Sequence, residues 1–144
     1  MKYPFNIIKV ILFYTTLILF TCLSVSLSAA KKATPEEIQK ITEAIPASIQ
    51  SAKKYKILVF SKAFTYYHSS IAVAKEMAKL MGQKTNLFET DFTDDPRDLS
   101  AENLRNYDAV YLNNSTSIER GLTTEKMRKE FIDFVRNGGG LVAI

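Results

Sequence analysis

The chain has 144 residues, 47% of them hydrophobic and 24% charged, which is the composition of one ordinary globular domain. This composition excludes a disordered chain, a collagen-like repeat and, with a single cysteine, a disulfide scaffold. Two of the 19 basic residues, Lys2 and Lys9, precede residue 31, so 17 basic residues remain against 15 acidic ones. These charges are too balanced and too interspersed for a nucleic-acid surface, so we expect no nucleic-acid partner.

The first 30 residues have the three-part organisation of a secretory signal peptide. Lys2 and Lys9 flank the start of an apolar run over 10–25, and small residues follow it up to Ala30. We predict cleavage after Ala30 and export, to the periplasm or out of the cell; the alternative is a membrane anchor formed by residues 10–30. Membrane contact is expected only through this segment, if it is uncleaved. Because Cys22 leaves with the signal, the mature chain is predicted to have neither a disulfide nor a thiolate nucleophile.

A capped helix and a linker are predicted over residues 31–55. Thr34, Pro35 and Glu37 form a capping box with proline at the first helical position, which predicts a helix from Pro35 to about Ala44. Pro46 ends this helix, and the small and polar residues that follow are typical of a tether. We interpret the segment as a spacer ahead of the main domain; the alternative is a helix that binds a partner.

Strands and helices alternate from residue 56 onward. Apolar runs predict strands at 57–60, 85–89, 108–112 and 141–144. One helix is predicted to begin near Ile71 and to stop at Gly82, and a brief helix covers 100–105. A last helix, capped by Thr123, ends at the glycines 138–140. This alternation predicts an α/β domain with a doubly wound parallel sheet of flavodoxin-like type.

The strand order follows from right-handed crossovers, which place the first, third and fourth strands together in the centre. Sheets of this type normally continue past an apolar strand like the fourth one, at 141–144, with another helix and another strand. We therefore expect residues 56–144 to be the N-terminal part of a longer domain, truncated after its fourth strand.

Ligands of open parallel sheets bind on the loops that follow the carboxyl ends of the strands, which here are the loops 61–70 and 113–121. The first loop carries the only histidine, His68, which either lines a site or is structural. Ser69 or Ser70 is predicted to cap the following helix rather than to act as a nucleophile. The backbone amides at this helix start are able to hold an anion or a polarised sugar oxygen.

The second loop offers many neutral donors and acceptors, among them Asn113, Asn114 and Thr116. Such groups suit a hydroxyl-rich ligand, and equally the ordinary chemistry of a turn. Four aspartates between the second strand and the brief helix suggest a metal cluster at first sight, but they lack the spacing of a calcium loop. We therefore predict a solvated loop for Asp91, Asp94, Asp95 and Asp98.

Several functions of flavodoxin-like proteins are excluded by single positions. A phosphoacceptor receiver domain requires an aspartate at the end of the third strand, where Leu112 and Asn113 stand. A flavin or dinucleotide site requires a Gly-rich or Ser/Thr-rich phosphate loop, and residues 61–67 contain no glycine. A class I amidotransferase requires a cysteine nucleophile, and the mature chain is predicted to have no cysteine. We accordingly expect no cofactor and no metal.

The remaining pattern resembles a known family. The resemblance rests on residues 56–71 (KILVFSKAFTYYHSSI), 107–116 (YDAVYLNNST), 122–125 (LTTE) and 131–144 (FIDFVRNGGGLVAI). In this order they are similar to the trehalose-utilisation (ThuA-like) domain. The resemblance implies a class I amidotransferase-like, flavodoxin-related fold without the catalytic cysteine, and a role in the uptake and processing of disaccharides, including 3-keto derivatives. Tyr66 and His68 match the first-loop motif of the family, whereas Thr65 replaces its glycine and Tyr67 its commonly basic residue.

Two functions follow from these observations. The first is an exported ThuA-like domain in disaccharide utilisation, with His68 as acid/base or polarising group, and with a small carbohydrate as its partner. The side chains expected to bind this sugar are Ser61, Lys62, Tyr66, Ser69, Asn113, Asn114 and Thr116. Further site residues of the family follow the Gly-Gly-Gly strand, so we expect this piece alone to be inactive. The second is a non-catalytic carbohydrate-binding or interaction module of the cell envelope.

Overall fold

The computed structural model describes residues 32–46 and 51–144, so the predicted signal segment lies outside the described residues. Within the described part, no helix is both long enough and apolar enough to span a membrane. Residues 32–46 and 51–144 contain a single sheet of four parallel strands, in the order β2-β1-β3-β4. The strands are β1 (Tyr55–Phe60), β2 (Phe88–Thr93), β3 (Ala109–Leu112) and β4 (Gly140–Ala143).

The connecting helices confirm the predicted α/β alternation. They are α2 (Pro35–Ala44), α3 (Ile71–Thr85), α4 (Ala101–Leu104) and α5 (Glu125–Arg136), with short 3₁₀ turns η1 (Pro96–Leu99) and η2 (Ile118–Arg120). The first, third and fourth strands are neighbours, as predicted. Only β1 and β3 are central, however, because β4 forms an edge of the sheet among the described residues.

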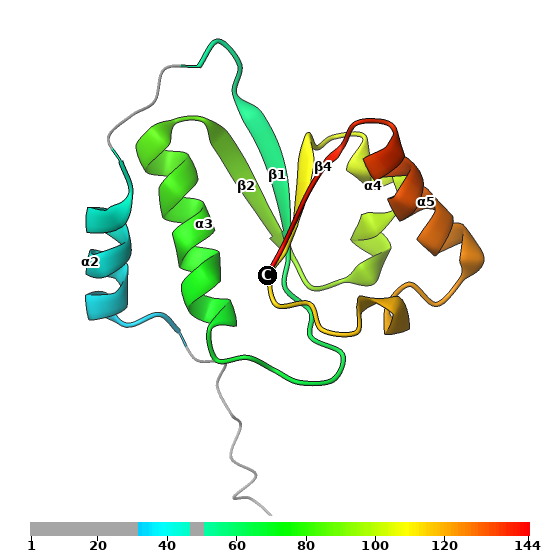
Figure 1. Cartoon of the computed structure of the whole chain (residues 1–144), viewed down its shortest axis with the longest axis horizontal. Coiled ribbons are helices and arrows are strands. Elements are labelled where there is room, and N and C mark those ends of the chain that lie inside the picture. The colour runs from blue at the N-terminus through cyan, green and yellow to red at the C-terminus, as the bar shows by residue number, and fades with distance from the viewer. Residues whose placement is uncertain (1–31, 47–50) are drawn as a thin grey trace, which may run out of the picture. The chain divides into compact units, whose positions relative to one another are not determined.

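The sheet has a hydrophobic core on each face, because successive side chains of a strand point to opposite sides. On one face, Leu58, Phe60 and Val110 belong to a cluster that Leu104 and Phe131 complete from α4 and α5. On the other face, a smaller cluster joins strands β1 and β3 to helix α3 through Val59, Tyr111 and Ala78. Figure 1 shows α3 on one side of the sheet and α4 and α5 on the other, the doubly wound arrangement that the sequence predicted.

Helix α2 has the predicted bounds and the predicted capping box. The Thr34 hydroxyl accepts a hydrogen bond from the Glu37 amide at 3.2 Å, and the Glu37 carboxylate accepts one from the Thr34 amide at 2.7 Å. The helix lies beside α3 (Figure 1), and the Lys84 ammonium donates to the Thr42 carbonyl at 2.5 Å. Ile45, which follows the last turn, is buried. The interpretation of residues 31–55 as a spacer did not include this packing of α2 beside α3.

The end of α3 and the start of β2 differ from the prediction. The helix continues past Gly82 to Thr85, whose hydroxyl donates back to the Met81 carbonyl at 2.6 Å. Asn86 then ends it in the left-handed conformation, at φ 56°. Since these residues are helical, β2 begins at Phe88 rather than at 85, and Asp91 lies within this strand rather than in a loop.

A second correction concerns the start of α5. Thr124, not Thr123, is the N-cap residue, and its side chain accepts a hydrogen bond from the Met127 amide at 3.1 Å. The hydroxyl of Thr123 lies 3.9 Å from the Met127 sulfur instead. Two adjacent threonines are equally suitable caps, so the sequence alone does not distinguish them.

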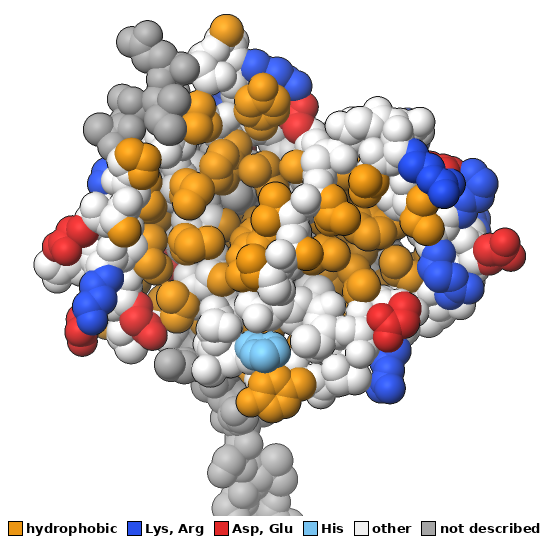
Figure 2. Space-filling view, viewed as in Figure 1, with side chains coloured by type: hydrophobic (Ala, Val, Ile, Leu, Met, Phe, Trp, Pro, Cys, Tyr) orange, Lys and Arg blue, Asp and Glu red, His pale blue; other side chains and the backbone are white. Residues whose placement is uncertain are grey.

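The two edges of the sheet differ in chemistry. On β2, Glu89 pairs with Lys54 and Asp91 with Lys56, at 2.8 and 2.9 Å. The β4 edge exposes apolar side chains instead, and Val142 is 55% exposed. Figure 2 shows hydrophobic side chains gathered over the sheet between its flanking helices. Part of this surface is an apolar groove of about 320 Å³, whose lining includes Met77, Met81, Phe88, Tyr111, Val142 and Ile144.

Candidate functional site

The two predicted site loops leave the sheet side by side. Phe60 and Leu112 are register partners at the ends of β1 and β3. The next residues are Ser61 and Asn113, and the Asn113 amide continues the ladder by donating to the Phe60 carbonyl at 2.9 Å. Because both strands run in the same direction, both loops begin at the same carboxyl edge.

Asn113 is the buried centre of this edge, with 0% of its surface exposed. Its side-chain nitrogen donates to the Ser61 hydroxyl at 3.1 Å and to the Ile71 carbonyl at 3.0 Å. Its side-chain oxygen accepts a hydrogen bond from the Asn114 amide group at 3.2 Å. The side chain therefore joins the ends of β1 and β3 to the first residue of α3, and it is fully buried in doing so.

Further hydrogen bonds tie the two loops to one another. The Phe64 amide donates to the Thr116 carbonyl at 3.0 Å, and the Thr116 hydroxyl donates to the Tyr66 carbonyl at 3.1 Å. The hydroxyls of Thr65 and Ser117 lie 3.3 Å apart. Ser115 donates to the Phe60 carbonyl at 3.0 Å. The second loop thus acts largely as a scaffold for the first.

Above this scaffold lies a rim formed by Tyr66, Tyr67 and His68. The tyrosines are 66% and 51% exposed, and His68 is half-buried. The rings of Tyr66 and His68 meet edge to face, with their centroids 4.7 Å apart and their planes at 78°. Figure 2 shows the histidine of the chain at the surface. The imidazole has no hydrogen-bond partner among residues 32–46 and 51–144, and its contact there is with the Tyr66 ring.

The serines after His68 have the predicted position but not the predicted contact. Ser70 is the N-cap residue of α3, yet its side chain makes no capping hydrogen bond. The turn is closed instead by the Ile71 amide, which donates to the His68 carbonyl at 3.1 Å. Ser69 and Ser70 are both exposed, so their hydroxyls face solvent beside the rim.

The predicted site residues therefore separate into two groups. Ser61 and Asn113 are buried, and Asn114 and Thr116 are half-buried beneath the rim. The exposed group comprises Lys62, Tyr66 and Ser69. Contact of any of them with a sugar stays a prediction. Sequence reasoning did not identify the ties made by Thr65, Ser115 and Ser117.

A comparison of the sequence with protein families gives a match over the region that contains both loops. The family model described as ThuA, trehalose utilisation, matches residues 56–144. The chain belongs to the ThuA family. No match was found among curated proteins or among solved structures.

The ThuA region contains both loops and all of the four-stranded sheet except Tyr55. The four-stranded parallel arrangement is consistent with the flavodoxin-like fold of this family and with the class I amidotransferase-like superfamily. Thr65, which stands where the resemblance leads us to expect glycine, needs no left-handed backbone. In the described part of the chain, the non-glycine residues with positive φ are Asn86, Asn114 and Ser117. The ThuA loop is therefore compatible with a side chain at 65.

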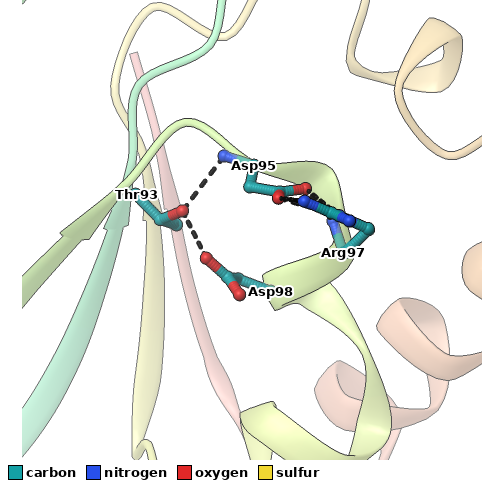
Figure 3. Close-up of polar contacts among 4 residues, drawn as sticks. All are labelled: Thr93, Asp95, Arg97 and Asp98. Carbon is teal, nitrogen blue, oxygen red and sulfur yellow. Dashed lines mark hydrogen bonds and ion pairs between the residues drawn. The ribbon is translucent and has the colours of Figure 1, made fainter.

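In the acidic segment that follows β2, the carboxylates of Asp95 and Asp98 accept hydrogen bonds from Arg97 and Thr93 (Figure 3). Asp95 accepts hydrogen bonds from the Arg97 side chain and, at 2.9 Å, from the Arg97 amide, and these donors lower the pKa of its carboxyl group to about 2. The Thr93 hydroxyl donates to Asp98 at 2.5 Å and accepts from the Asp95 amide at 3.0 Å. The charge of Lys62, from the first loop, contributes a smaller part of the same lowering of the Asp95 pKa.

Asp91 is held separately, on β2. Its carboxylate pairs with Lys56 at 2.9 Å and accepts from the Tyr107 hydroxyl at 2.9 Å. These contacts lower the pKa of Asp91, and burial together with the Asp91 hydrogen bond raises the pKa of Tyr107 to about 12. Within the described residues, no group of three or more His, Cys, Asp or Glu side chains is arranged to hold a metal ion.

Proposed function

We propose that this ThuA domain binds a neutral disaccharide, or its 3-keto derivative, at the rim formed by Tyr66, Tyr67 and His68. The observation that carries this proposal is the pair of exposed tyrosine rings beside a half-buried imidazole, on the loop that follows the central parallel strand β1. An aromatic ring offers an apolar face to the C–H groups of a sugar and a polar tip to its hydroxyls. The surrounding groups are largely neutral, which suits a ligand without charge.

In this proposal His68 contacts the sugar and acts as a general acid/base or as a polarising group. An imidazole is able to donate a proton to an oxygen or to accept one from it, and this side chain makes no hydrogen bond to the described residues. The edge contact with Tyr66, at 4.7 Å between centroids, limits the orientations open to the imidazole ring. Thr116 and Asn114 support the loop from below.

Calorimetry with trehalose and with its 3-keto derivative tests the binding step. Tyr66→Ala is expected to weaken binding of the sugar at least tenfold, because it removes the most exposed ring of the rim. Tyr55→Ala is the matched control, since Tyr55 is also exposed but begins β1 at the opposite edge of the sheet. An equal loss of affinity in both variants contradicts the proposed site.

Because residues 56–144 alone are expected to be inactive, turnover assays on the full-length protein separate the enzyme from the alternative, a non-catalytic carbohydrate-binding module. For the enzyme, His68→Ala abolishes turnover of 3-keto glycosides and leaves the thermal unfolding midpoint unchanged. Turnover that is unaffected by His68→Ala contradicts the assigned role. If the full-length wild type binds the sugar but does not turn it over, the result supports the non-catalytic module. The module would bind the sugar at the same rim and loops as the enzyme.

We further propose that the protein is exported by residues 1–30. The support is the order of basic, apolar and small residues in this segment. N-terminal sequencing of the protein recovered from cell fractions tests this proposal. A mature chain that begins at Lys31 supports cleavage, whereas an intact Met1 in the membrane fraction supports an anchor.

A further inference from the structure

A single buried amide connects both loops of the candidate site to the helix that follows His68. Asn113 uses one side-chain nitrogen for two acceptors, the Ser61 hydroxyl at the end of β1 and the Ile71 carbonyl at the start of α3. The Ile71 amide in turn donates to the His68 carbonyl at 3.1 Å. The backbone of His68 is therefore two hydrogen bonds away from the Asn113 side chain.

The orientation of this amide is fixed from its other end. The Asn114 side chain donates to the Asn113 oxygen at 3.2 Å, which directs both N–H groups of Asn113 toward Ser61 and Ile71. Asn114 reaches this position from a left-handed backbone, at φ 51°, a conformation that asparagine adopts more readily than most residues. The two successive asparagines thus have different tasks, one as the link and one as its support.

We infer that Asn113 is a positioning residue for His68 rather than a sugar ligand. Its side chain is fully buried, and its polar atoms are all used within the protein. No other uncharged side chain of similar size supplies two donors and an acceptor at once, and an aspartate supplies no donor when ionised. The functional importance of this positioning rests on the proposed role of His68.

The single histidine of the chain makes this inference directly measurable, because every imidazole signal in a ¹H–¹³C NMR spectrum, from Cδ2–H and Cε1–H, belongs to His68. Asn113→Ser removes one of the two donors without adding charge. We expect the His68 signal to shift or to broaden, while the methyl signals of Leu99 and Leu104, in the core on the α5 side, stay in place. Asn106→Ser is the matched control, because Asn106 also donates to a backbone carbonyl, at 3.0 Å, but is exposed and precedes β3.

If Asn113→Ser does not fold, Ser61→Ala provides the test with Asn113 intact. It removes one of the two acceptors, so we expect a smaller shift of the same His68 signal. A His68 signal that is unchanged in the folded variants overturns the inference. Addition of trehalose to the wild type tests the proposed function separately: if trehalose leaves the His68 signal in place and Asn113→Ser moves it, the positioning role holds and the sugar site does not.

Discussion

Gly82 approaches Phe88 so closely that a Cβ atom on the glycine would lie 2.6 Å from the Phe88 carbonyl oxygen and 3.0 Å from its ring. The glycine therefore does not end α3, as the sequence suggested, but allows the last turn of α3 to pack on the first residue of β2. Adding a methyl group here forces a backbone oxygen to move, and the strand with it.

Gly82→Ala is accordingly expected to destabilise the protein, although alanine is the better helix former. The gain in helix propensity is about 1 kcal/mol, and overpacking against backbone costs about 1 to 3 kcal/mol. We expect a net loss in the free energy of unfolding, measured by urea denaturation. Gln83→Ala, one position further on the exposed side, should change it by less than about 0.5 kcal/mol. A Gly82→Ala protein more stable than wild type would contradict the close approach.

Two adjacent threonines at the start of α5 allow a test of which one is the N-cap residue. Thr124→Ala removes the side chain that accepts from the Met127 amide, and should lower the free energy of unfolding by about 1 kcal/mol. Thr123→Ala should cost less than about 0.5 kcal/mol, because its hydroxyl contacts only the Met127 sulfur among the described residues. Urea denaturation of both variants measures the difference, and the reverse ranking would place the cap one residue earlier.

The pair of Asp95 and Arg97 predicts a response to acid. The Arg97 guanidinium lowers the pKa of the Asp95 carboxyl group to about 2, below the ordinary value of 3.8. Because the folded value lies below the unfolded one, this pair stabilises the fold above about pH 4, and the contribution is lost as pH falls from about 4 to 2.

Arg97→Gln should therefore raise the midpoint of the Asp95 titration, followed through its carboxyl ¹³C signal. The midpoint need not reach the ordinary value, since the backbone amide of residue 97 still donates to the carboxylate. Arg105→Gln serves as the control, because Arg105 is exposed and pairs with no acidic residue in the described part of the chain. An Asp95 midpoint that is the same in wild type and in Arg97→Gln would show that the pair does not form in solution.

When residues 1–144 are produced as they stand, the β4 edge predicts self-association. Val142 and Ile144 are 55% and 62% exposed at an edge that carries no charged side chain, whereas β2 is lined by ion pairs. Charged residues on an edge strand oppose pairing with another chain. Val142→Lys should therefore reduce the fraction of oligomers in sedimentation velocity experiments. Ile132→Lys, which charges an exposed apolar residue of α5, should have little effect, and an equal effect of both would point to general hydrophobicity instead.

Local chemistry was enough to predict some elements from sequence. The bounds of α2 were predicted because Thr34, Pro35 and Glu37 mark its start and Pro46 lies just beyond its end. The buried strand β1 and the loops after β1 and β3 were likewise predicted, since continuous apolar runs followed by polar residues are typical of parallel sheets.

Other features depend on contacts that no local pattern contains. Helix α3 extends to Thr85 because Asn86, rather than Gly82, takes the left-handed conformation, and the need for glycine at 82 comes from Phe88. Asn113 was predicted to bind a ligand because it follows a strand at the site edge, and its contact with a sugar stays a prediction. Its buried hydrogen bonds could not be predicted, because the acceptors on Ser61 and Ile71 are distant in sequence.

The hydrogen bond between Asn113 and Ser61 joins residues 52 positions apart in the chain. The loop that carries His68 is thus held by a part of the chain that comes only after α3, β2, η1, α4 and β3. Contacts of such long range form only when the intervening chain has folded, since closing the loop costs entropy before the contact is made. The rim is therefore expected to acquire its geometry together with the pairing of β1 and β3, and a peptide spanning only residues 56–85 should not reproduce it.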